Sequence, residues 1–286
     1  MKTILVATDF SVNATHAAEY GCQIAAQLHA NLTLCNAFVV PAEVPDAGFV
    51  TWPLYEYEEM MKDSGEELKK LKKQLESSID AANFRPEISC INEAGFVTDV
   101  VNSSVSRKEV KLVVAGTHGT NGLSEFIMGN HSNKLIEETI CPLLLVPPTA
   151  AVVPIKKIAF ATDFTDPEKD LECIYELIAL VRPMNVEVLI TYVHNDEHQS
   201  PAFKLWLDEF LVSISNKADY PNVYYRMVRN DNPNRGLEWL CEHGHIDILA
   251  MVHREHSFIG KLFNGSHTQK MARNISIPLL VMHQKK

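Results

Sequence analysis

The chain opens with Lys2-Thr3-Ile4-Leu5-Val6-Ala7-Thr8-Asp9-Phe10-Ser11, and this stretch returns as Lys156-Lys157-Ile158-Ala159-Phe160-Ala161-Thr162-Asp163-Phe164-Thr165. A second stretch, Cys141-Pro142-Leu143-Leu144-Leu145-Val146, returns as Ile277-Pro278-Leu279-Leu280-Val281-Met282. Repeats of this length indicate two copies of one fold. The first pair of matching stretches is 154 residues apart and the second pair is 136 residues apart. The second copy therefore has a deletion of 18 residues, and we place this deletion after its second strand. The proline-rich segment 147–154 reads as a linker between two domains, 1–148 and 154–286.

Short apolar runs alternate with longer helical segments in both copies. The strand-like runs are 4–7, 32–38, 87–91, 112–115 and 143–146 in the first copy, and 158–161, 186–193, 223–228, 246–251 and 279–282 in the second. Helical segments of the first copy are expected at 13–29, 55–82, 98–107 and 131–139. This pattern is typical of buried parallel strands joined by right-handed crossovers. We therefore predict an α/β fold with two tandem five-stranded parallel-sheet domains and helices on both faces.

Composition excludes several classes of function. The formal net charge of -10 argues against duplex nucleic acid as the main partner, because phosphate binding needs a basic surface. No uninterrupted apolar run approaches the roughly 18 residues of a membrane span, so we expect no membrane partner. The six cysteines are dispersed and form no C-x-x-C, which favours reduced thiols in a cytoplasmic protein.

The most informative motif follows the fourth strand of the first copy. It reads Gly116-Thr117-His118-Gly119-Thr120-Asn121-Gly122-Leu123-Ser124-Glu125-Phe126-Ile127-Met128-Gly129-Asn130-His131-Ser132. Glycines at 116, 119 and 122 allow positive φ and a close approach of the backbone to a ligand. A helix is expected to begin near Asn130, and the free N–H groups of a helix start favour phosphate. In parallel sheets ligands lie at the carboxyl ends of the strands, where this loop begins.

The spacing G-x2-G-x9-G, followed by a small polar residue, resembles the ATP-binding signature of universal stress proteins. The stretch 116–129 matches that spacing, and the sequences of 113–119 and 141–146 are close to those usual in the family. The resemblance covers both copies, and the chain is identified as a member of this family. It implies an adenine-nucleotide α-hydrolase-like fold, ATP as cofactor with Mg²⁺ only as its companion, and two copies paired through their last strands as an internal pseudo-dimer. Whether two chains associate as a homodimer, and with which protein partner, is left open.

The resemblance also assigns roles to individual residues of the first copy. Asp9 matches the acid near adenine and ribose, and Ala37 a backbone position that contacts adenine. The phosphate-loop glycines are matched by Gly116, Gly119 and Gly129, and Asn130 stands where the family usually has Ser or Thr. The other candidate binding residues are Ala7, Val114, Thr117, His131 and Ser132. For Asp9 the alternative role is to cap the following helix, and the two roles are compatible.

The second copy has lost much of this loop. At the shift of 136, Val252, Glu255 and Phe258 replace the three glycines 116, 119 and 122, while Gly265-Ser266 stands opposite Gly129-Asn130. Side-chain bulk and a negative charge at these positions oppose the binding of a triphosphate. We expect no ATP in the second copy, although retained Asp163 and Ser266 leave room for a smaller ligand.

Other chemistries lack motif support. The chain has no Walker loop, no G-x-G-x-x-G after either first strand and no G-x-S-x-G elbow, so we assign no catalytic residues and expect at most a slow ATPase. His194 and His198, and the group His253, His256 and His267, form no recognised metal array, so no metal site is expected. The alternative to nucleotide binding is a dimeric interaction protein that needs no nucleotide. Segment 39–57 is either a lid over the pocket or an ordinary surface loop.

Overall fold

The structure is a computed structural model that describes residues 2–39, 54–79, 84–107, 109–117, 130–194, 201–253 and 276–283. The first half contains β1 (Thr3–Ala7), α1 (Val12–Leu28), β2 (Asn31–Phe38), α2 (Leu54–Ser78), β3 (Ile88–Ala94), α3 (Val97–Arg107), β4 (Val110–Gly116), α4 (Asn130–Glu138) and β5 (Leu143–Val146). The second half contains β6 (Lys157–Ala161), α5 (Pro167–Val181), a 3-10 turn η1 (Arg182–Met184), β7 (Glu187–His194), α6 (Pro201–Ala218), β8 (Val223–Arg229), α7 (Pro233–His243), β9 (Ile248–His253) and β10 (Leu279–His283). From β1 to β4 and from β6 to β9, strands and α-helices alternate in the same order in both halves, as the repeat predicts.

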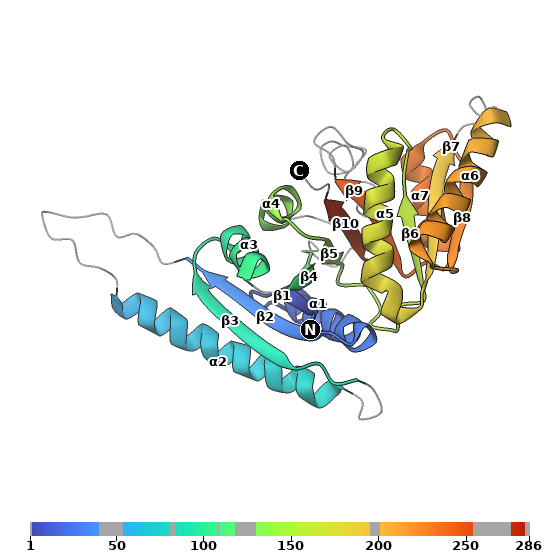
Figure 1. The fold of residues 1–286 in the computed structure, drawn as a ribbon. Coiled ribbons are helices and arrows are strands. Elements are labelled where there is room, and N and C mark those ends of the chain that lie inside the picture. The colour runs from blue at the N-terminus through green and yellow to red at the C-terminus, as the bar shows by residue number, and fades with distance from the viewer. Residues whose placement is uncertain are drawn as a thin grey trace, which may run out of the picture.

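The ten strands form one sheet in the order β3-β2-β1-β4-β5-β10-β9-β6-β7-β8. Neighbouring strands are parallel within each half, and β5 and β10 pair antiparallel where the halves meet. Figure 1 shows the two halves side by side, with helices on both faces of the sheet. The predicted α/β architecture and the pairing of the two last strands are confirmed.

Alternating apolar residues divide the core between the two faces of the sheet. In β1, Ile4 and Val6 belong to the cluster beneath α1 and α2, whereas Leu5 and Ala7 belong to the cluster beneath α3 and α4. Both clusters continue into the second half. Because strands buried on both faces need apolar side chains at every position, they read as continuous apolar runs in the sequence.

Several predicted boundaries differ from the observed ones. Strand β3 continues to Ala94 instead of ending at residue 91, because its pairing with β2 extends to Phe38 opposite Ala94. Polar Asn92 and Glu93 are compatible with the position of β3 at the edge of the sheet, where it pairs with one of the described strands, β2. Strand β9 begins and ends two residues later than predicted, and α2 ends at Ser78 instead of residue 82. Helix α2 has 25 residues and α6 has 18, in agreement with a deletion between the second and third strands.

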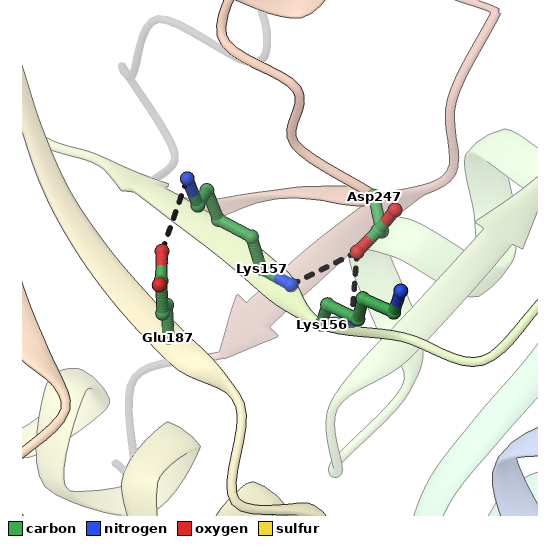
Figure 2. Close-up of polar contacts among 4 residues, drawn as sticks. All are labelled: Lys156, Lys157, Glu187 and Asp247. Carbon is green, nitrogen blue, oxygen red and sulfur yellow. Dashed lines mark hydrogen bonds and ion pairs between the residues drawn. The ribbon is translucent and has the colours of Figure 1, made fainter.

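Polar contacts fix the end of the linker to both halves. The Gln27 side chain of α1 donates to the Ile155 carbonyl at 3.1 Å and accepts from the Ile155 N–H at 2.8 Å. The Asp247 carboxylate, just before β9, accepts from the backbone N–H groups of Lys156 and Lys157 at 2.7 and 2.9 Å (Figure 2). Asp247 therefore holds the start of β6 in place beside β9. In the same view, Lys157 Nζ lies 3.0 Å from a carboxylate oxygen of Glu187.

Candidate functional site

A cavity of about 270 Å³ lies at the carboxyl ends of β1, β2, β3 and β4. Its described lining consists of Ala7, Thr8, Asp9, Ser11, Asn13, Ala14, Ala37, Val39, Gly95, Phe96, Val97, Ala115, Gly116 and Leu135. Most of this wall is apolar, and the described residues in it include a single charged side chain, that of Asp9. The position agrees with the rule that ligands of parallel sheets bind beyond the carboxyl ends of the strands.

Asp9 is held by a tight turn between β1 and α1. Phe10 has a φ of 64°, and its N–H donates to the Thr8 hydroxyl at 3.1 Å. The N–H of Ser11 donates to Asp9 Oδ1 at 3.0 Å, and the Ser11 hydroxyl caps α1 by accepting from the Ala14 N–H at 3.2 Å. Ser11 is thus the helix cap, and the exposed Asp9 carboxylate is directed by its turn to the mouth of the cavity.

Gly116 has a packing role that sequence reasoning missed. A Cβ placed on Gly116 would lie 2.6 Å from the Asn13 carbonyl oxygen and 3.2 Å from the Ala14 nitrogen. The end of β4 therefore approaches the start of α1 more closely than any side chain permits. Gly116 is needed for this helix–strand contact, and the same contact forms one corner of the cavity.

The predicted site residues divide into three groups. Ala7, Asp9, Ala37 and Gly116 line the cavity together. Val114 is fully buried in the sheet, and the buried Thr117 donates its N–H to the Val146 carbonyl at 3.0 Å; neither lines the cavity. The remaining candidates are Asn130, His131 and Ser132, which form the first turn of α4 with side chains outside the described part, and Gly119 and Gly129, which lie outside the described residues.

The part of the cavity wall that the turn between β3 and α3 forms was not predicted from the sequence. Gly95, Phe96 and Val97 come from the turn between β3 and α3, and Gly95 has a φ of 147° that favours glycine. The N–H of Gly95 donates to the Phe38 carbonyl at 2.9 Å, which brings the turn beside the end of β2. The sequence signal for this turn was Gly95, which directly follows the polar end of β3. It was missed because the strand was predicted to end at residue 91.

No cysteine is among the described residues that line this cavity. Burial raises the pKa of the Cys141 and Cys241 thiols to about 12 and that of the Cys22 thiol to about 11. A nucleophilic or metal-binding cysteine must be deprotonated, so these three thiols are unsuited to either role. Among the described residues, no three His, Cys, Asp or Glu side chains gather as a metal site, and no helix is long and apolar enough to cross a membrane.

Solved structures of similar fold cover nearly the whole of this chain. A universal stress protein from Archaeoglobus fulgidus covers 99% of this chain and 98% of its own length, with a TM-score of 0.73 and 14% identity. A functionally unknown protein from Pseudomonas aeruginosa, PA1789, covers 99% and 92%, with a TM-score of 0.58 and 11% identity. At these identities the likeness concerns the fold alone.

Sequence comparison agrees with the repeat. Universal stress protein MJ0531 of Methanocaldococcus jannaschii is 27% identical over 146 residues, which are 51% of this chain and 81% of that protein. The model of the universal stress protein family matches residues 1–147 and, a second time, residues 154–283. The two matches together span nearly the whole sequence, and the chain therefore belongs to the universal stress protein family.

Proposed function

We propose that the first half binds ATP or a related adenine nucleotide, and that it hydrolyses the nucleotide slowly or not at all. The observation that carries this proposal is the cavity at the strand ends, with Asp9 at its mouth and the glycine loop leading from its wall to the start of α4. Occupancy would then act by shifting the populations of conformers or the affinity for a partner.

The described residues fit the separate parts of such a ligand. Ala37 and Val97 offer apolar walls to a base, and the Asp9 carboxylate suits the hydroxyls of a ribose. The volume of about 270 Å³ is just below the range of roughly 300–1,000 Å³ typical of small-molecule sites, so the cavity would hold the nucleoside part. The phosphates, with Mg²⁺ as their companion, would extend past Gly116 towards the first turn of α4, whose N–H groups attract anions.

Slow turnover is expected from the same lining. Phosphoryl transfer needs cationic groups that stabilise the transition state and a residue that orients the attacking water. The described part of the cavity wall contains no Lys, Arg or His. Bound nucleotide would therefore persist as a ligand.

Calorimetric titration of ATP with Mg²⁺ into the full chain tests the proposal, with Asp9→Asn as the variant. Asn keeps the acceptor for the Ser11 N–H but removes the charge, so the turn should survive. We expect about one equivalent of ATP per chain, and binding weakened roughly tenfold or more in the variant, since a hydrogen bond to a charged group contributes about 1.5–3 kcal/mol.

Asp163→Asn is the matched control, because Asp163 accepts from the Thr165 N–H at 3.0 Å in an equivalent turn of the second half. ATP binding should be unchanged in this control. Absence of heat and of thermal stabilisation by ATP would favour the alternative, an interaction protein that needs no nucleotide. Two equivalents per chain would show that the second half also binds ATP.

A further inference from the structure

Strand β8 forms the edge of the sheet in the second half (Figure 1). It pairs with β7 over the seven residues Val223–Arg229 without a shift in register, and no other described strand lies beside it. Many edge strands are protected from further pairing by a proline, a lysine or a bulge. Because β8 has none of these three, it is a template on which another strand can pair.

The hydrogen bonds at its two ends show which backbone groups of β8 face outward. The Asn222 carbonyl accepts from the Val188 N–H at 2.8 Å, and the Asn230 N–H donates to the His194 carbonyl at 2.9 Å. Successive residues of a strand direct their N–H and C=O groups to alternate sides, so the even-numbered residues bond to β7. The N–H and C=O groups of Tyr225, and of the residues two positions before and after it, therefore point away from β7.

The side chains of β8 are unusually open to solvent for their type. Tyr224 is 50% exposed and Tyr225 is 48% exposed, and Arg226 beside them is also exposed. Val223 and Met227 pack against the core cluster to which α6 belongs, so Tyr225 lies on that face, while Tyr224 and Arg226 lie on the other. Four of the seven residues of β8 are exposed, against two of seven in β3, the equivalent edge of the first half. The edge at β8 is therefore the more accessible of the two.

We propose that β8 pairs antiparallel with β8 of a second copy of this chain, about a two-fold axis at Tyr225. Each Tyr225 then lies opposite the other copy's Tyr225, and each Val223 lies opposite Met227. All three positions have outward-facing backbone groups, so these pairs exchange about six hydrogen bonds. On the other face of the sheet, Tyr224 lies opposite Arg226 in both directions, which places a guanidinium beside an aromatic ring twice.

Side-chain chemistry selects this register from its neighbours. A two-fold axis one residue further along would put Arg226 opposite Arg226, and like charges directly opposite destabilise a strand pair. An axis one residue earlier would put Pro221, which has no N–H, at a hydrogen-bonded position opposite Met227. The axis at Tyr225 avoids both and pairs aromatic and apolar side chains with their like.

The fold already joins two of its copies in this manner, since β5 and β10 pair antiparallel and continue one sheet from half to half. A stable dimer buries about 1,200–2,000 Å² in total, which is more than a short strand pair supplies. Helix α6, which packs on β8, adds exposed Leu205 (64%) and Val212 (59%), seven residues apart and so on one side of the helix. We therefore expect a reversible dimer with a dissociation constant in the micromolar range.

Sedimentation velocity of the full chain without nucleotide, from about 1 to 100 μM, tests for this dimer. Tyr225→Pro removes an N–H that faces away from β7, so the fold should persist, as circular dichroism can check, while dimerisation weakens at least tenfold. Absence of a dimer at the highest concentration would overturn the proposal, as would a dimer that the variant leaves unchanged. Species larger than a dimer would indicate head-to-tail pairing of β8 with the β3 edge instead, and would equally overturn it.

Cysteine cross-linking tests the register and does not depend on the proline variant. In a Cys90→Ser background, which removes the exposed cysteine, Tyr225→Cys should form a covalent dimer under mild oxidation. The two Cα atoms of such a pair lie about 5.5 Å apart, within the reach of a disulfide. Met227→Cys is the matched control, because its counterpart lies four residues along the strand, roughly 13 Å away.

Equal cross-linking of both cysteine variants would overturn the proposed register. ATP titration of the same variants separates this proposal from the first, because β8 lies outside the nucleotide cavity of the first half.

Discussion

Gly116, the last residue of β4, and Val252, near the end of β9, occupy equivalent positions in the repeat, and the start of the first helix differs between the two halves. At Gly116 the backbone of Asn13 lies where a side chain would begin, and α1 begins at Val12. In the second half α5 begins at Pro167, one residue later in the repeat, and Asp166 caps it instead of the residue that corresponds to Ser11. Gly116 at the end of β4 thus allows the start of α1 to pack directly against the sheet.

Gly116→Ala should destabilise the protein by about 1–3 kcal/mol, because the added Cβ meets backbone that cannot move aside. The check is the midpoint of urea unfolding. Gly65→Ala is the control: it lies within α2, its Cβ would meet only Asn92 Nδ2 at 3.8 Å, and it should stabilise by roughly 0.5–1 kcal/mol. Equal shifts in the two variants would contradict the close approach at Gly116.

At the scale of elements, Asp247 and Glu187 show how differently two carboxylates act at the start of β6. The Asp247 carboxylate accepts hydrogen bonds from two backbone N–H groups, those of Lys156 and Lys157. Glu187 pairs with the Lys157 side chain, and its own side chain is 47% exposed. Hydrogen bonds from backbone to carboxylate fix the course of the chain, whereas a solvent-exposed ion pair contributes little.

Asp247→Ala should therefore lower the free energy of unfolding by about 1–2 kcal/mol, because two backbone donors lose a charged acceptor. Glu187→Gln should change it by less than about 1 kcal/mol. Urea unfolding of both variants, beside the wild type, measures the contrast. A larger effect of Glu187→Gln would show that the ion pair, and not the backbone contact, holds β6.

At the scale of the whole molecule, the halves are joined by the β5–β10 pairing and by a contact next to it. Leu144 and Leu280 face each other across the junction in the continuous sheet. His283, the last residue of β10, lies with Nε2 2.7 Å from the Ile136 carbonyl of α4. Burial lowers the pKa of His283 below its ordinary value of 6.5, and the hydrogen bond to Ile136 opposes part of this effect.

Because the folded-state pKa of His283 is lowered, the unfolded chain binds the proton more tightly. His283 therefore lowers the stability as pH falls below about 6.5, and has no such effect above it. Thermal unfolding between pH 7.5 and 5.5 should show a smaller loss of stability in His283→Gln than in the wild type. Parallel pH profiles for the two proteins would contradict the assignment.

Sequence alone determined the repeat, the class of fold and the strand ends at which the first-half cavity lies, because buried parallel strands and strand-end turns leave local patterns. Gly116 was found in this way, and Asp9 through the family resemblance. Tertiary structure decided the rest. Gly95 reaches the first-half cavity only because β3 pairs with β2 as far as Ala94. In the second half, Asp170 lines a cavity beside Ala161 and Asp163 only because of the position of α5. Contacts of this kind depend on how distant segments pack, and packing leaves no periodic signal in the sequence.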